Sequence, residues 1–133
     1  MEKNVKSVLN MERLLFDRIS FERLGFKNEN ELVYNLNVSI MQKQNEDVYK
    51  VTLKLKANKE KEYLVELELT GYFIIESDEG LTEEIKSSLI NQNAVAIMMP
   101  YLRSQLSLIT AQPDVECVVM PPLNIAGLMS DED

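Results

Sequence analysis

The sequence predicts an α+β domain in which a four-stranded antiparallel sheet is followed by helices packed on one of its faces. Apolar and polar residues alternate through the stretches 32–40, 48–57 and 63–76. Only short polar connectors separate these stretches, which is typical of antiparallel hairpins with one buried face. Clear helical spacing of apolar residues begins after residue 81. The sheet is therefore expected to come first and the helices second.

The N-terminal part is less regular. Residues 1–12 have weak helical spacing, and we expect a mobile extension or a short helix there. Residues 13–24 are expected to form the first strand, in which the large apolar residues change parity midway: Leu14, Phe16, Ile19 and Phe21. One extra residue in a strand reverses the parity, so the pattern predicts a bulge or bend. A loop follows at 25–31.

The next three strands each have one apolar and one polar face. The polar face is basic on the strand at 48–57 and acidic on the strand at 63–76. If these strands form a hairpin, the charges lie across from one another, in cross-strand pairs that contribute about 0.2–1 kcal/mol each. The residues concerned are Lys54, Lys56, Glu66 and Glu68. Gly71 inside the last strand predicts a bulge or a close approach by another backbone.

Two helices are expected after the sheet. Thr82 is a suitable N-cap for the first, because acidic residues follow it in the first turn. Proline is best tolerated in a first helical turn, so Pro100 predicts that the second helix begins at 98 or 99 and ends near 111. Its apolar positions are Leu102, Leu106, Leu108 and Ile109. The remaining chain is expected to be mostly extended.

Composition restricts the class of protein. The chain has 133 residues, enough for one domain with a substantial core. Its formal net charge of −8 argues against nucleic acid and anionic membranes as partners. No stretch approaches the roughly 20 apolar residues that a membrane-spanning helix requires, and the N-terminus has no signal-peptide pattern. We expect a cytoplasmic protein that is not inserted into a membrane.

The sequence offers little for catalysis. It has no histidine and one cysteine, which excludes histidine-dependent catalytic triads and the usual zinc sites. Cys117 is expected to be a small, buried or half-buried apolar residue. The glycines form no phosphate-binding loop. We therefore expect no catalytic residue, no metal and no cofactor, and we interpret the acidic segment 130–133 as a solubilising tail.

Two features suggest binding. Four of the seven methionines lie in the last third of the chain: Met98, Met99, Met120 and Met129. Methionine suits surfaces that accept many apolar shapes, although ordinary core filling is the alternative. Leu64 stands beside acidic residues on the polar face of its strand. It could be an isolated exposed leucine or a docking point for a basic, partly apolar segment.

Five stretches resemble successive blocks of the SecB family of protein-export chaperones, in order and at similar separations. They are "DRISFE" (17–22), "DVYKVTLKL" (47–55), "YLVELELTGYFII" (63–75), "MPYLRSQLS" (99–107) and "MPPLNIAGLM" (120–129). The Pro-Tyr-x-Arg and Pro-x-Asn elements are the most specific parts. The resemblance implies a SecB-like domain at 13–129, between an extension at 1–12 and a tail at 130–133.

The resemblance also implies a function. SecB-like proteins are homotetramers, dimers of dimers, that hold unfolded preproteins without ATP and deliver them to SecA for export. The client-binding groove would be formed by Leu24, Phe26, Tyr63, Ile97, Met98, Met99, Leu128 and Met129. The basic, zinc-binding tail of SecA would dock on the outer sheet face at Glu22, Leu64 and Glu66. A further acidic position of the family is Arg18 here, a reversal of charge.

Two alternatives remain open at this point. One is a SecB-like chaperone dedicated to a single client such as an antitoxin, which Arg18 and the short C-terminus favour. The other is an adaptor with the same fold and no chaperone activity. The breadth of clients separates the first alternative from the export chaperone, and exposed apolar surface separates both from the adaptor.

Overall fold

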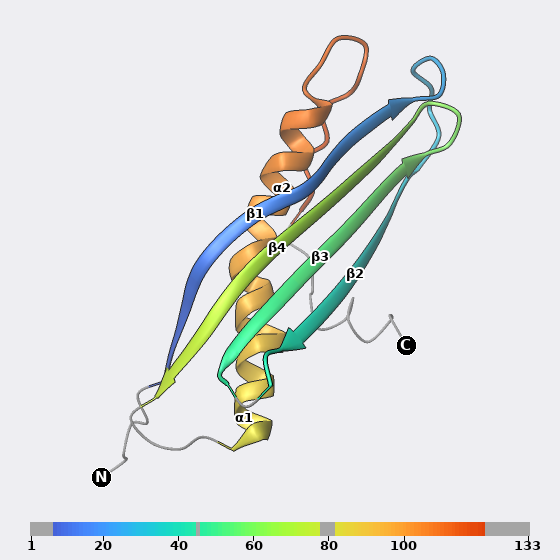
Figure 1. Cartoon of the computed structure of the whole chain (residues 1–133). Coiled ribbons are helices and arrows are strands. Elements are labelled where there is room, and N and C mark those ends of the chain that lie inside the picture. Colours follow the sequence, from blue (N-terminus) through green and yellow to red (C-terminus); the bar gives the residue numbers. More distant parts are fainter. Residues whose placement is uncertain (1–6, 45, 78–81, 122–133) are drawn as a thin grey trace.

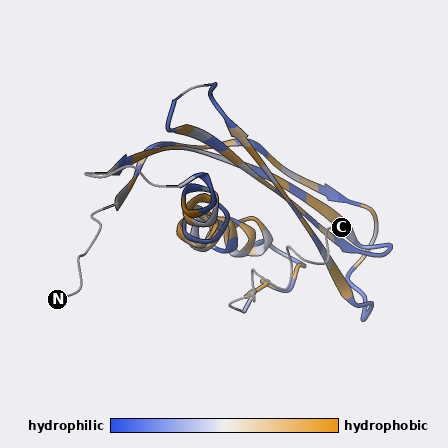
Figure 2. Cartoon of the chain, turned by 90° about the horizontal axis from the view of Figure 1, so that it is seen from below, coloured by the Kyte–Doolittle hydropathy of each residue, from blue (hydrophilic) through white to orange (hydrophobic). Residues whose placement is uncertain are grey.

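The computed structural model describes residues 7–44, 46–77 and 82–121. Four strands form one antiparallel sheet in the order β1-β4-β3-β2. Their bounds are β1 Ser7–Arg23, β2 Leu32–Gln42, β3 Val48–Lys59 and β4 Tyr63–Ser77. A helical segment then crosses one face of the sheet (Figure 1). The predicted α+β architecture is confirmed, and the helix lies on the concave side of the curved sheet (Figure 2).

β1 is longer than the sequence predicted. Residues 7–12 belong to the strand and pair with the last part of β4, starting from Ser7 opposite Ser77. The expectation of a helix or mobile segment there was wrong, because the edge of a 15-residue β4 satisfies the backbone groups of these residues. The predicted bulge is confirmed between Phe16 and Arg18, and a second lies between Met11 and Arg13. The bulges bring the apolar side chains on both sides of the parity change onto the inner face.

The central hairpin has the expected register. Lys54 lies opposite Glu68, and Lys56 lies opposite Glu66. The inner faces of β3 and β4 form most of the core, in which Val51, Leu53, Leu67 and Leu69 are fully buried, among others.

Gly71 takes part in the regular strand pairing on both of its sides. The expected close approach at this glycine is made by side chains and not by another backbone. A Cβ atom here would lie 2.7 Å from the Phe73 ring and 3.0 Å from the Met98 sulfur. Gly71 therefore leaves the space in which the helix packs closely on the sheet.

The helical part is continuous, unlike the two helices predicted. α1 (Glu83–Ser88), a π-helical segment (Leu89–Ala94) and α2 (Val95–Thr110) follow one another directly. Thr82 caps the start of α1 as expected, since its hydroxyl accepts a hydrogen bond from the Ile85 amide at 3.1 Å. The predicted start at 98 or 99 was wrong, because Pro100 lies inside α2.

Burial explains why the helix continues through this proline. An interior proline costs about 3 kcal/mol or more. The turn before it buries Val95, Met98 and Met99 against the sheet, each worth about 1.5–3 kcal/mol.

The opposite side of α2 carries a second apolar stripe. Leu102 and Leu106 are fully buried, but Leu108 is 68% exposed. Ile97 and Tyr101 are also exposed, and their spacing with Leu108 places all three on one helical face. The sheet of a single chain therefore covers only part of the apolar surface of the helix.

After α2 the chain returns along the end of the helix. The Val118 amide donates to the Thr110 hydroxyl at 2.9 Å, and the Ser107 hydroxyl donates to the Val118 carbonyl at 2.6 Å. Met120 is buried. Cys117 is exposed, so the expectation of a buried or half-buried residue was wrong. Its thiol nevertheless donates to the Ser107 carbonyl at 3.5 Å.

Candidate functional site

The loop between β1 and β2 presents two exposed apolar side chains. Leu24 is 53% exposed and Phe26 is 86% exposed, the largest value among the large apolar residues of the described chain. The backbone at the start of the loop is fixed: the amides of Leu24 and Gly25 donate to the Glu62 carbonyl at 2.7 and 3.1 Å. A Cβ atom on Gly25 would lie 2.3 Å from the Lys61 carbonyl oxygen. The loop therefore lies directly against the β3–β4 turn.

A hollow lies beside this loop, between the strand ends and the segment that follows α2. Its lining residues are Asn30, Leu32, Lys59, Tyr63, Glu116, Cys117, Val118 and Val119. The lining combines apolar and hydrogen-bonding side chains, and Val119 is 80% exposed. This end of the sheet therefore presents the exposed apolar side chains of Leu24 and Phe26 next to a hollow whose lining includes hydrogen-bonding groups. Such a surface suits an extended polypeptide segment.

Tyr63 is the one predicted groove residue that lines this hollow. It is only 2% exposed and stacks on Phe21, with 5.1 Å between the ring centroids. Burial, and then the charge of Glu62, raises the pKa of Tyr63 to about 12. The hydroxyl therefore keeps its proton to a higher pH than an exposed tyrosine would.

The predicted groove residues of α2 lie elsewhere. Met98 and Met99 are buried beneath the sheet of their own chain, whereas Ile97 is 39% exposed on α2. Met98 packs against β4 at Gly71. Gly71 lies eight residues beyond Tyr63 on this strand, and at about 3.4 Å per residue the two positions are about 27 Å apart. Leu128 and Met129 lie outside the described residues. Within one chain, the predicted groove residues therefore do not form one compact site.

The outer face of the sheet brings together the second predicted set. Glu22 lies directly opposite Leu64 in the β1–β4 ladder, and Glu66 lies two residues further along the same face. The Glu66 carboxylate accepts a hydrogen bond from Arg18 at 3.1 Å and lies 3.9 Å from the Lys56 ammonium. The acidic patch expected from the sequence is therefore partly neutralised by cations of the same chain.

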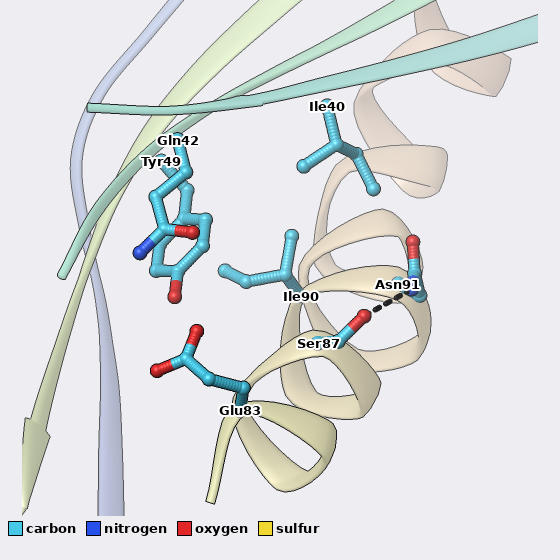
Figure 3. Close-up of a pocket in the computed structure, with 7 residues that line it drawn as sticks. All are labelled: Ile40, Gln42, Tyr49, Glu83, Ser87, Ile90 and Asn91. Atoms are coloured by element: carbon cyan, nitrogen blue, oxygen red, sulfur yellow. Dashed lines mark hydrogen bonds between the residues drawn. The ribbon is translucent and has the colours of Figure 1, made fainter. Parts of the chain in front are cut away.

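A second hollow lies at the other end of the sheet, where α1 meets β2 and β3 (Figure 3). Ile40 and Ile90 form its apolar side, and the Tyr49 hydroxyl points toward the Glu83 carboxylate. Burial, and then the charges of Asp47 and Glu83, raises the pKa of Tyr49. The remaining lining residues are Gln42, Ser87 and Asn91, the last two joined by a hydrogen bond of 3.1 Å.

Sequence reasoning missed the contacts that fix the β1–β2 loop. Glu62 is fully buried. Its carboxylate accepts a hydrogen bond from the Asn28 backbone amide at 2.9 Å and forms an ion pair with the Lys59 ammonium at 2.9 Å. In the sequence Glu62 belongs to the polar run "NKEKE", which reads as an exposed connector. The two asparagines of the loop were the available signal, because asparagine favours loops held by local hydrogen bonds.

The described residues offer neither a metal site nor a membrane-spanning helix. No group of three or more histidine, cysteine, aspartate or glutamate side chains is placed to hold a metal ion in the described part of the chain. The helices of this part include none with the length and apolar character needed to cross a membrane.

Comparison with known proteins gives one family match. The model of the family described as preprotein translocase subunit SecB matches residues 2–133. The uncharacterized protein MJ0357 of Methanocaldococcus jannaschii is 29% identical over 140 residues, which cover 98% of this chain and 88% of the relative.

Two solved structures share the fold. The SecB-like chaperone Rv1957 of Mycobacterium tuberculosis, in complex with a peptide from the HigA1 antitoxin, has a TM-score of 0.66 at 15% identity. The alignment covers 86% of this chain and 90% of that one. A protein of unknown function from Streptococcus agalactiae has a TM-score of 0.52 at 9% identity, covering 90% of this chain and all of that chain. At these identities the likeness concerns the fold.

Proposed function

The chain belongs to the SecB family, and from this we propose that it is a holdase, a chaperone that binds unfolded preproteins for export through the Sec pathway without using ATP. The observation that carries the proposal is the loop that holds Leu24 and Phe26 in solvent, at the end of the sheet where a hollow has both polar and apolar lining residues. A bound client would cover these side chains, at about 1.5–3 kcal/mol for each one fully buried. The protein would act in the cytoplasm, by binding alone, with no catalysed reaction and no cofactor.

We further propose that the working form is a homotetramer, a dimer of dimers. The exposed side chains of Tyr101 and Leu108 on α2 support this, because exposed apolar residues on one helical face mark interaction surfaces. β1 and β2 are also both edge strands in the single chain, and edges are commonly covered by a partner. Assembly would bring surfaces of several chains together, and the groove would include Tyr63, Ile97, Leu128 and Met129 of neighbouring subunits. Met98 and Met99, which are buried in their own chain, would support the groove from beneath.

For delivery to the export motor we propose SecA as a partner, docking at Glu22, Leu64 and Glu66. The shared outer face and the cross-strand pairing of Glu22 with Leu64 support this patch. The second candidate function is a SecB-like chaperone dedicated to one client such as an antitoxin. The contact of Arg18 with Glu66 favours it, because this cation opposes a basic partner.

The test is suppression of aggregation of a reduced, unfolded model protein, with and without ATP. Wild-type protein should suppress aggregation equally in both conditions. The double substitution Leu24→Asp and Phe26→Asp should weaken suppression, because a buried charge without a partner is costly. Met41→Asp is the matched control, since Met41 is 62% exposed and lies at the opposite end of β2. If an excess of wild-type protein does not suppress aggregation, the proposed holdase function is wrong and the adaptor without chaperone activity becomes the leading alternative.

A further inference from the structure

The β1–β2 loop is tied to the β3–β4 turn along most of its length. Besides the two amides that donate to the Glu62 carbonyl, the Asn28 amide donates to the Glu62 carboxylate at 2.9 Å. The side-chain amides of Asn28 and Asn30 donate to the Glu60 carbonyl at 3.0 and 2.9 Å. The loop backbone on both sides of Phe26 is therefore attached to one short turn.

The turn does not need the Glu62 carboxylate for its own closure. The Glu62 amide donates to the Lys59 carbonyl at 2.9 Å, and Lys61 supplies the left-handed backbone with φ of 65°. The neighbouring Glu60 and Lys61 are exposed, as is usual for a turn. A buried carboxylate at Glu62 is costly to desolvate, so its hydrogen bonds, and not the turn, account for its burial.

The carboxylate is held in its charged form by its surroundings. Its ion pair with Lys59 is almost entirely shielded from solvent, with side-chain exposures of 11% and 0%. Burial raises the pKa of Glu62, but the hydrogen bonds from Asn28 and Lys59 and the charges of Lys59 and Arg23 outweigh it, so that the pKa is lowered. The second carboxylate oxygen has no hydrogen-bond partner in the described structure.

We propose that Glu62 is a positioning residue for client binding: its carboxylate, oriented by Lys59, holds the Asn28 amide and so keeps the loop in the conformation that exposes Leu24 and Phe26. This inference rests on the proposed chaperone function. A loop that is already fixed does not lose conformational entropy when the client binds, and the client gains affinity for that reason. A released loop would populate many conformers, of which only a fraction would present both side chains.

The central test variant is the double substitution Lys59→Met and Glu62→Met in the full-length protein. Replacing both partners of a buried ion pair by apolar side chains of similar length avoids an unpaired buried charge and is often neutral for stability. The Asn28 amide nevertheless loses its acceptor. Glu60→Met is the matched control, because the Glu60 side chain is exposed and its contribution to the loop is made by its backbone carbonyl.

The first readout is residue-resolved hydrogen exchange. In the double variant the Asn28 amide should exchange at least about tenfold faster, whereas amides in the β3–β4 ladder should change by less than about twofold. Wild type and Glu60→Met should be alike. Unchanged exchange at Asn28 would overturn the proposal. Faster exchange throughout the sheet would also overturn it, since Glu62 would then have a general structural role.

The second readout is the affinity for reduced, carboxymethylated lactalbumin, which stays unfolded. The double variant should bind it roughly tenfold more weakly, and Glu60→Met should bind it as wild type does. Equal binding by all three proteins, with a released loop, would overturn the role of the loop conformation in binding. If wild type itself binds no client, the proposed function fails, and the exchange readout still decides whether Glu62 holds the loop.

Discussion

Arg18→Glu is the substitution that decides most sharply between the export chaperone and the dedicated chaperone. The Arg18 guanidinium lies 3.1 Å from the Glu66 carboxylate, on the outer face where a basic SecA tail would dock. The substitution removes this cation and adds a carboxylate to the face that already holds Glu22 and Glu66. We expect the variant to bind a basic SecA-tail peptide, carrying its zinc, more tightly than wild type.

The structure limits the size of this effect. The side chains of Arg18 and Glu66 are 52% and 32% exposed, and ion pairs of this kind contribute about 0–1 kcal/mol. Removing one repulsion and adding one attraction should together give about 1 kcal/mol, or roughly fivefold in Kd. The fold should lose no more than about 1 kcal/mol, part of it from the like charge placed opposite Glu68. High salt should abolish the gain in affinity.

Calorimetric titration at low and high salt measures this effect. The control is Arg13→Glu, which makes the same change of net charge at an exposed position of β1 further from Leu64, opposite Tyr72. Glu66→Lys should abolish binding. If Arg18→Glu and Arg13→Glu increase the affinity for the peptide equally, the effect is one of net charge and no docking patch exists. If no protein binds the peptide at low salt, the dedicated chaperone becomes the leading function.

Three further predictions address packing, pH and assembly. Gly71→Val should lower the free energy of unfolding in urea by about 1–3 kcal/mol, because its side chain would clash with Phe73 and Met98; an unchanged value would show that these side chains move aside freely. The lowered pKa of Glu62 means that its charge stabilises the fold above the unfolded pKa of about 4.5, and that this contribution is lost as the pH falls through the folded pKa. The difference in unfolding free energy between wild type and Glu62→Gln should therefore shrink on acidification from pH 7, and a constant difference would contradict this assignment. Light scattering should give about four times the chain mass of 15.3 kDa, and Leu108→Asp should reduce it, whereas a wild-type monomer at micromolar concentration would refute the assembly.

Local patterns were sufficient to predict most of the sheet. The alternation in β2, β3 and β4 is itself the consequence of one face meeting the helix, so it could be read from each stretch alone. The first six residues of β1 alternate only from Leu9 to Glu12, which is too short a stretch to predict a strand, and their strand conformation depends on the distant edge of β4. The start of the helix was misplaced for a similar reason: the local cost of Pro100 is visible in the sequence, but the burial of Val95, Met98 and Met99 that exceeds it is not.

The candidate site was harder to predict than the fold. The pairing of Glu22 with Leu64 depends on two bulges that shift the β1 register, and sequence alone gave only one of them. Nothing local separates Glu60, which is exposed, from Glu62, which is buried. The difference arises where the loop crosses the turn, a contact between segments more than 30 residues apart. Sites that depend on contacts between distant segments cannot be predicted from the sequence of one segment alone.

If the proposed holdase function holds, the separation of the exposed apolar groups would favour unfolded chains as clients. The loop with Leu24 and Phe26 packs on the turn that leads into Tyr63, whereas Ile97 adjoins Met98, about 27 Å further along β4. An extended polypeptide advances about 3.3 Å per residue, so roughly eight residues of client are needed to reach from one group to the other. A folded protein rarely offers an extended apolar segment of that length, whereas an unfolded one offers many. Each contact alone is worth only a few kcal/mol, so a client would bind through several contacts and leave as they release one by one. A holdase without ATP needs this combination, because nothing but the weakness of single contacts drives release.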